Sequence, residues 1–206
     1  MKTNIKIQRF SAYGLLGLVL AVPIYNSTRA TPAKTIYAVP ARSVFDSIGI
    51  NDAKAIREKR IAYIKQFHHV AQAEQQKYGV PASITLAQGI LESENGTSTL
   101  AVKNKNHFGI KCFSKGCKKG HCSNYSDDSH KDFFRKYTSN WESFRHHSKV
   151  LTGERYRSLI GRPAKDWIWG LKKRGYATDK RYPQKLRGII DEYRLVEFDV
   201  PAASRS

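Results

Sequence analysis

Leu86-Ala-Gln-Gly-Ile-Leu-Glu92-Ser-Glu-Asn-Gly-Thr-Ser98 is the stretch from which the fold of this 206-residue chain can be predicted. An apolar run that opens at Pro81 predicts a helix buried on nearly all sides, with Glu92 at its carboxyl end. A Gly/Ser/Asn turn follows, so the carboxyl group is expected to be half buried and half open to a groove. Burial and the negative end of the helix dipole both raise a carboxyl pKa, as a proton donor at neutral pH requires. Glu92 is therefore a candidate catalytic acid.

Helical periodicity surrounds this segment. Apolar residues at three- and four-residue steps predict a helix from Asp52 to Tyr78, where Gly79 suits a carboxyl-terminal cap. Further helices are expected at about 98–102, from Ser139 or Asn140 to 151, at 163–174 and at 181–195. Between about 108 and 137, aromatic residues flank a Gly/Lys/Ser/Asp-rich middle, which predicts a small β-hairpin. The predicted fold is α+β and mainly helical, with a small β-lobe beside a cleft that can seat an extended polymer.

The amino terminus has the order of a secretory signal peptide. Lys2, Lys6 and Arg9 precede the uncharged apolar run 12–22, and cleavage is expected after Ala30. The run is shorter than the roughly 20 apolar residues of a transmembrane helix, and an uncleaved membrane anchor is the alternative. We therefore expect export to the periplasm, cell envelope or extracellular space, without stable membrane insertion after cleavage.

The predicted organisation has four segments. Pro, Ser and Gly without periodicity favour a linker before the domain, and the last residues have the composition of a disordered tail. The predicted segments are a signal peptide at 1–30, a linker at 31–51, the domain at 52–198 and the tail at 199–206. No internal repeat is visible, and we expect a monomer.

The charge is strongly basic. The chain carries 36 Lys and Arg against 17 Asp and Glu, a net charge of +19. Residues 1–30 hold four basic residues and no acidic one, so the mature part keeps a net charge of +15. For an exported protein, such charge favours anionic cell-wall polymers. Export and the scattered lysines argue against nucleic acid as a partner. A merely solvated surface is the alternative.

Three cysteines lie close together, at Cys112, Cys117 and Cys122. In an oxidising compartment two of them can form a disulfide and leave one free. His107 and His121 make zinc conceivable, but the cysteine spacing fits no common zinc module. We therefore expect no metal and no cofactor. A cysteine nucleophile is also disfavoured, because no second catalytic group accompanies it.

Four motifs then occur in one order: Ala87-Gln88…Leu91-Glu92-Ser93…Gly96-Thr97-Ser98, Asn106-His-Phe-Gly-Ile-Lys111, Phe134-Arg135-Lys136-Tyr137 and Gly170-Leu-Lys-Lys-Arg-Gly-Tyr176-Ala-Thr-Asp179. Together they resemble the bacterial peptidoglycan N-acetylglucosaminidase family of flagellar and autolysin type, over roughly residues 60–195. The resemblance implies a lysozyme-like fold and cleavage of the β-1,4 bond after N-acetylglucosamine in peptidoglycan glycan strands. It places Glu92 on the general acid of the family and Tyr176 on its cleft tyrosine.

The chain departs from the family pattern at two places. Glu94-Asn95 stands where the family often has Gly-Trp, which puts a second carboxylate near Glu92. The second acid of the family, a glutamate in the β-lobe, has no clear counterpart. Asp127 and Asp128 are candidates, with Asp128 favoured, although an Asp-Asp pair is also typical of a solvated turn. Such a carboxylate can act as base, as nucleophile, or by orienting the acetamido group of the sugar.

Other motif residues are candidates for substrate binding, each with a structural alternative. Tyr176 can stack on a sugar ring or cap a helix, and Phe108 can line the cleft floor or anchor the hairpin. Asn106 and Ser98 complete the candidate set. His107, His146 and His147 are expected to be surface or packing residues.

Rival functions remain open. A lytic transglycosylase or a muramidase can use the same fold, but a transglycosylase motif continues into Gly-Leu-Met-Gln, where this chain has Asn106–Lys111. A non-catalytic cell-wall-binding protein is a second alternative, because the second acid is unmatched. A basic antimicrobial or DNA-binding protein is a more distant one.

Overall fold

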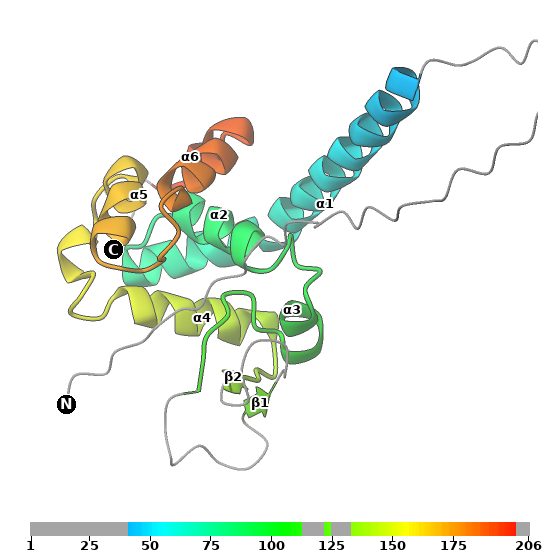
Figure 1. Ribbon diagram of the computed structural model, residues 1–206. Coiled ribbons are helices and arrows are strands. Elements are labelled where there is room, and N and C mark those ends of the chain that lie inside the picture. The colour runs from blue at the N-terminus through cyan, green and yellow to red at the C-terminus, as the bar shows by residue number, and fades with distance from the viewer. Residues whose placement is uncertain (1–40, 113–121, 125–132, 201–206) are drawn as a thin grey trace, which may run out of the picture. The chain divides into compact units, whose positions relative to one another are not determined.

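A computed structural model describes residues 41–112, 122–124 and 133–200, with side chains from Asp52 onward (Figure 1). The chain divides into two compact units, one taking in Ile56–Ser206 and the other Phe10–Ala55, and the packing and the site described below belong to the first. The predicted signal peptide, Cys117 and the pair Asp127 and Asp128 lie outside the described residues. Within the described part, no helix combines the length and apolar character needed to cross a membrane.

The predicted mainly helical α+β architecture is confirmed. A two-stranded antiparallel sheet interrupts the helices, and the expected helices recur within a few residues of their predicted bounds, except the first, which begins at Ala41 rather than at Asp52. The elements, in chain order, are α1 (Ala41–Tyr78), α2 (Ala82–Glu92), α3 (Thr99–Asn104), β1 (Cys122–Asn124), β2 (Phe133–Arg135), α4 (Asn140–Leu151), η1 (Arg157–Leu159), α5 (Ala164–Lys173), α6 (Tyr182–Glu192) and η2 (Leu195–Phe198).

The linker predicted at 31–51 is wrong in its second half, because α1 begins at Ala41. Gly49 lies inside the helix, where it costs only about 1 kcal/mol relative to Ala and so does not end it. The composition of this segment suggested a linker, but the part from residue 41 to residue 51 contains no residue that prevents helix formation.

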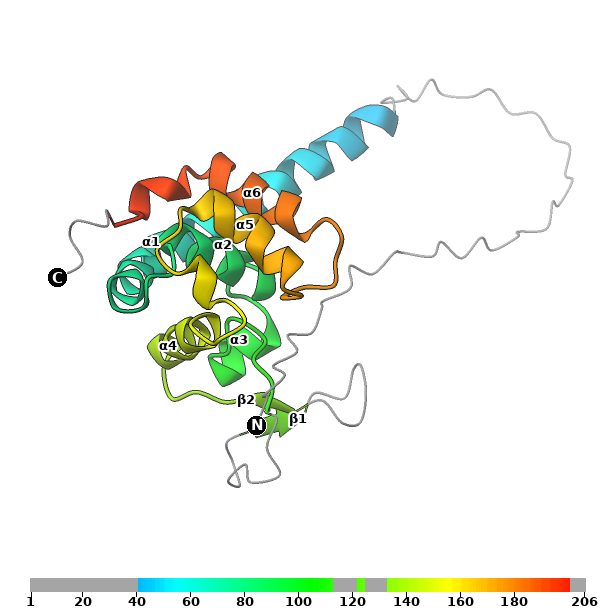
Figure 2. The ribbon, with the colours of Figure 1, turned by 90° about the vertical axis from the view of Figure 1, so that its left-hand side faces the viewer.

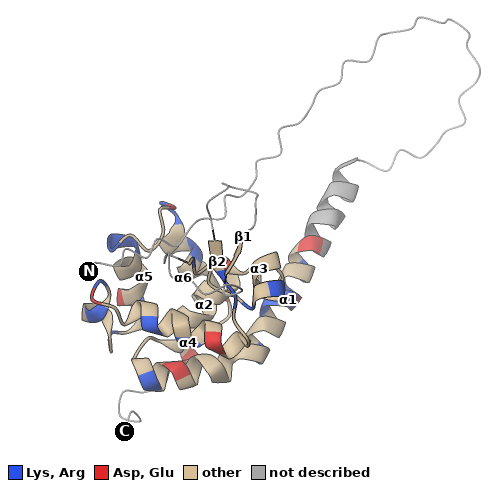
Figure 3. Ribbon diagram, turned by 90° about the horizontal axis from the view of Figure 1, so that it is seen from below, with Lys and Arg blue, Asp and Glu red and all other residues tan. Residues whose placement is uncertain are grey.

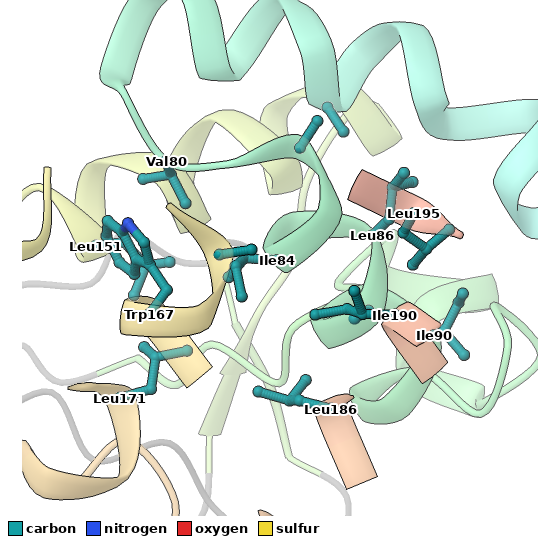
Figure 4. Packing of buried hydrophobic residues seen from close by; sticks show 14 of the residues in the cluster. Val80, Ile84, Leu86, Ile90, Leu151, Trp167, Leu171, Leu186, Ile190 and Leu195 are labelled. Carbon is teal, nitrogen blue, oxygen red and sulfur yellow. The ribbon is translucent and has the colours of Figure 1, made fainter. Parts of the chain in front are cut away.

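The core is built around α2. Every residue from Ala82 to Ile90 is buried, and α2 packs against α5, α6 and η2. Figure 4 shows the side chains that surround it, which include Trp167 and Leu171 from α5, Leu186 and Ile190 from α6, and Leu195 from η2. Figure 2 shows α5 and α6 beside α2 in a second view. An apolar helix of this kind is stable only when neighbours cover all its faces, as the sequence predicted.

The amino terminus of α2 is capped from the far end of the domain. The Asp199 carboxylate accepts hydrogen bonds from the Ser83 backbone N–H and hydroxyl, each at 2.8 Å. The Gln75 side-chain amide pairs with the Val200 backbone at 2.9 and 3.0 Å and also accepts from the Ala82 N–H at 3.1 Å. The disordered tail predicted from residue 199 is therefore wrong for Asp199, which the first turn of α2 holds, and for Val200, which Gln75 on α1 holds.

A disulfide closes the β-lobe, and polar contacts hold α4, the helix that follows it. In the β1–β2 pair, Ser123 stands opposite Phe134, and Lys111 forms a separate bridge to Phe134. Cys112 and Cys122 form a disulfide, which confirms that two of the three cysteines pair. Ser139 caps α4, and the Arg145 guanidinium on α4 binds the buried carboxylate of Glu74 on α1 at 2.7 and 3.0 Å.

Replacing Asp199 with Ala is expected to lower the free energy of unfolding by about 1–2 kcal/mol, because two donors of the first turn of α2 lose their acceptor. Thermal unfolding should show a melting temperature lower by several degrees, on the order of 2–4 °C per kcal/mol. Asp199→Asn keeps an oxygen acceptor and should lose less. Equal melting temperatures for wild type and Asp199→Ala would contradict the capping role.

Candidate active site

Glu92 is the last residue of α2, and a tight turn leads the chain away from it. Glu94, Asn95 and Gly96 have φ values of +52°, +62° and +84°, the left-handed region that Gly and Asn accept most readily. The buried Ser93 holds this turn, since its hydroxyl donates to the Gly89 carbonyl and accepts from the Gly96 N–H. The helix therefore stops at Glu92, and Glu94 is carried out to an exposed position.

The Glu92 carboxyl group is poised to exchange a proton near neutral pH. The residue is half-buried, and the Tyr182 hydroxyl donates a hydrogen bond of 2.9 Å to its Oε1 atom. Burial raises the pKa of Glu92 to about 7, although the Tyr182 hydrogen bond and the positive charge of Lys185 pull that pKa down. Glu94 contributes nothing to this shift. Both forms of the Glu92 carboxyl are thus populated at neutral pH.

Tyr176 lies near Glu92 but inside the protein. Its side chain is 2% exposed, and its ring centroid lies 5.7 Å from that of Tyr182. Burial raises the pKa of Tyr176 well above its usual range, and the negative charge of Glu92 adds to this. The Tyr176 hydroxyl is buried and makes no hydrogen bond of ordinary geometry with the described residues. Neither the ring nor the hydroxyl of Tyr176 is therefore open to a sugar in this structure.

The loop after Tyr176 is held by two lysines. The Lys172 ammonium on α5 donates to three successive backbone carbonyls, those of Ala177, Thr178 and Asp179, at 3.4, 3.2 and 2.9 Å. Lys185 on α6 binds the Asp179 carboxylate at 2.8 Å. This pairing, together with the Arg181 N–H, lowers the pKa of Asp179. The motif around Tyr176 therefore fixes the segment that joins α5 to α6, both of which pack on α2.

The other predicted substrate-binding residues have partners within the protein. Ser98 caps α3 by accepting from the Ala101 N–H at 3.2 Å. Asn106 is buried and donates to the Ile110 and Arg135 carbonyls while accepting from the Ile110 N–H. Phe108 is fully buried and stacks on His147 with ring centroids 3.9 Å apart. We therefore do not carry these three residues into the proposed substrate site.

Two hollows lie apart from Glu92. One, of about 440 Å³, is lined by residues near the α2 amino terminus, among them Pro81, Arg162 and Asp199. The other, of about 340 Å³, lies between α1 and the 95–97 turn and includes Tyr63 and Lys105. Neither is lined by Glu92, so neither locates the reacting bond. Among the described residues, no group of three or more His, Cys, Asp or Glu could hold a metal ion.

Tyr182 and Lys185 are the neighbours of Glu92 that the sequence did not reveal. They lie on α6, about ninety residues further along the chain, and reach Glu92 only because α6 packs on α2. Gln88 is a signal that could have helped, because it is a fully buried amide within an apolar helix. A buried amide needs a polar partner, and its partner here is the Tyr182 hydroxyl, at 3.0 Å.

Comparison with known proteins places the chain in a family. Residues 68–195, more than half of the chain, match the family model Glucosaminidase, described as mannosyl-glycoprotein endo-beta-N-acetylglucosaminidase. The chain therefore belongs to the glucosaminidase family, as its motifs predicted. The exo-glucosaminidase LytG of Bacillus subtilis is 33% identical over 162 residues, covering 72% of this chain and 56% of that protein. The peptidoglycan hydrolase FlgJ of Escherichia coli K12 is 30% identical, covering 68% and 48% respectively.

Solved structures agree with the fold. The catalytic domain of the autolysin Auto from Listeria monocytogenes matches with a TM-score of 0.59 and 27% identity, covering 81% of this chain and all of that one. The glycoside hydrolase domain of FlgJ from Salmonella typhimurium matches with a TM-score of 0.57 and 27% identity, covering 67% and 90%. The predicted lysozyme-like fold is thus confirmed. The chain spans about half the length or less of the curated relatives named above.

Glu92→Gln is expected to stabilise the protein more at pH 8 than at pH 5. The pKa of Glu92 is higher in the folded protein than its usual value of 4.5. The Glu92 carboxyl group therefore makes its full contribution to the free energy of unfolding below about pH 4.5, and this contribution is lost as the pH rises through about 7. Glutamine has the same shape and does not ionise. Melting temperatures measured across this pH range should diverge between the two proteins, and a constant difference would show that Glu92 titrates normally.

Proposed function

We propose that this protein is an exported glycoside hydrolase that cleaves the β-1,4 bond after N-acetylglucosamine in peptidoglycan glycan strands. Glu92 is the general acid. The observation that carries the proposal is the half-buried carboxyl group at the end of α2, with a pKa of about 7, in a chain of the glucosaminidase family. The names of the relatives, an exo-glucosaminidase and a peptidoglycan hydrolase, support the same substrate.

The chemistry of a glycosidic bond explains why such a group is needed. The leaving sugar oxygen must be protonated as the bond breaks, and a donor with a pKa near the working pH does this most efficiently. Glu92 holds its proton in part of the molecules at pH 7, unlike an ordinary exposed glutamate. Tyr176 is buried close to it and completes the surroundings of the carboxyl group from inside the protein.

A second carboxylate is proposed in the segment between β1 and β2. Asp128, with Asp127 as the alternative, can act as base, as nucleophile, or by orienting the acetamido oxygen of the substrate. Both aspartates belong to the stretch that joins two paired strands, so they belong to the β-lobe in sequence. The stereochemical course of the reaction follows from which of these roles the aspartate has.

Asp128→Asn is expected to lower kcat by about a hundredfold with little change in KM, because a charged group that acts on the transition state is removed. Asp127→Asn is the matched control, with the same change of charge one residue away. Initial rates on purified peptidoglycan would compare them. If Asp127→Asn is the more damaging change, the two assignments are exchanged, and if neither matters, the second carboxylate lies elsewhere.

The basic surface supports an anionic cell-wall partner. Figure 3 shows Lys and Arg at several separate places along the helices rather than on a single one. The net charge of +15 on the mature part attracts anionic polymers over a wide area and needs no dedicated groove. We propose that this charge concentrates the enzyme on the wall, where a monomer is sufficient for catalysis. Export rests on the amino-terminal sequence pattern and on the disulfide, which is typical of oxidising compartments.

Glu92→Gln is expected to abolish lysis of peptidoglycan suspensions while the protein still folds and binds the wall. Mass spectrometry of wild-type digests should find reducing N-acetylglucosamine ends. Anhydro-muramic ends would instead identify a lytic transglycosylase, and reducing muramic ends would identify a muramidase. Wild-type lysis by Glu92→Gln would refute its role as acid, and a wild-type protein that binds without cleaving would be a wall-binding protein.

A further inference from the structure

Four polar side chains form a row of hydrogen bonds that ends at Glu92. His147 Nε2 on α4 lies 3.1 Å from Gln88 Oε1 on α2. Gln88 Nε2 donates to the Tyr182 hydroxyl on α6 at 3.0 Å, and this hydroxyl donates to Glu92 Oε1 at 2.9 Å. His147 and Gln88 are fully buried, and Tyr182 is 4% exposed. The row therefore crosses three helices through the core, without solvent in contact with its first two members.

The direction of this row follows from the chemistry of its last member. An ionised carboxylate can only accept, so the single hydroxyl proton of Tyr182 must point to Glu92. The Tyr182 oxygen then accepts from Gln88, which requires the NH₂ group of Gln88 to face it. The Gln88 carbonyl oxygen is thereby turned to His147, whose Nε2 must carry a hydrogen. Each bond fixes the orientation of the next.

We infer that Gln88 and His147 are positioning residues that, through Tyr182, reserve Oε1 of Glu92 as an acceptor and leave Oε2 to carry the transferable proton. The inference rests on the proposed role of Glu92 as general acid. With Oε1 already accepting from Tyr182, a proton on the carboxyl group is located on the other oxygen. The carboxyl group therefore presents its acidic hydrogen in one direction.

The surroundings of His147 keep it a permanent donor. Its ring stacks on Phe108 with an interplanar angle of 15°, and its Nδ1 has no hydrogen-bond partner among the described residues. Burial, helped by the neighbouring His146, lowers the pKa of His147 to about 3. The ring is thus neutral at every pH at which Glu92 titrates, with its one hydrogen on Nε2. Phe108, a candidate for the cleft floor, instead holds this ring in place.

The charged and titratable groups that act on Glu92 come from two places in the described part of the chain. Tyr182 and Lys185 belong to α6, and Tyr176 belongs to the loop before it. Lys185 also binds Asp179, so its position is fixed by that loop. Of these groups, Tyr182 alone is hydrogen-bonded to Glu92, and it favours the ionised form. Removing its hydroxyl should therefore raise the pKa of Glu92.

Tyr182→Phe is expected to raise the pKa of Glu92 by about one pH unit, the size of one charge-assisted hydrogen bond. Carboxyl carbon NMR of protein labelled with ¹³C-glutamate would measure this directly, with Glu92→Gln assigning the signal. The basic limb of the pH–rate profile on peptidoglycan should move up by the same amount. Tyr193→Phe, which removes another buried tyrosine hydroxyl, should leave both measurements unchanged.

The role of His147 is tested by two variants of similar size. His147→Met removes the donor, so the Gln88 amide can turn its oxygen toward Tyr182 and compete with Glu92 for the hydroxyl proton. His147→Gln restores an N–H donor. The pKa of Glu92 is expected to rise in His147→Met and to return toward the wild-type value in His147→Gln, each measured on protein shown by thermal unfolding to be folded.

Two results would overturn the inference: an unchanged pKa of Glu92 in Tyr182→Phe, or equal pKa values in the two His147 variants. If either His147 variant fails to fold, the titration of Glu92 in Tyr182→Phe decides alone. A further result separates the inference from the proposed function. If the carboxyl pKa moves as expected while the basic limb of the rate profile stays in place, the row of hydrogen bonds is upheld and Glu92 is not the acid.

Discussion

The burial of α2 on nearly all sides is the constraint on which the remaining structure depends. An eleven-residue helix with nine buried residues cannot be stable alone, so α5, α6 and η2 must cover it. Glu92 is half-buried because it is the last residue of this covered helix. The raised pKa of its carboxyl group is thus a consequence of packing. A helix exposed on one face would place the same residue in water and leave it an ordinary acid.

The same burial accounts for the polar contacts inside the core. Gln88 lies on a helix with no route to solvent, and burying an amide without partners costs several kcal/mol. His147 and Tyr182 satisfy it from two neighbouring helices. The hydrogen bonds that satisfy the buried Gln88 amide therefore also orient the groups around Glu92. The stability of the core and the surroundings of the Glu92 carboxyl group depend on one set of hydrogen bonds, which limits the substitutions that either can tolerate.

The sequence was sufficient to predict the structural features that depend only on residues close together in the chain. Periodicity located the helices, and the turn after Glu92 followed from Asn95-Gly96 and a preceding serine. Cys112 and Cys122 were recognised as possible partners, but their pairing needed the fold. Tyr182 was not foreseen as the partner of Glu92, nor Asp199 as the cap of α2, because each meets its partner only after distant segments pack. Phe108 and Asn106 drew attention as motif residues, yet packing and loop geometry explain them.

The cap supplied by Asp199 has a consequence for the order in which the domain can form. The carboxylate that completes the first turn of α2 is 116 positions further along the chain than the serine it binds. During synthesis, α2 emerges long before its cap and before most of its covering helices. Its first turn gains its last hydrogen bonds only once the chain is complete to Asp199. The central helix and the end of the domain are therefore joined late in folding, and each is stabilised by the arrival of the other.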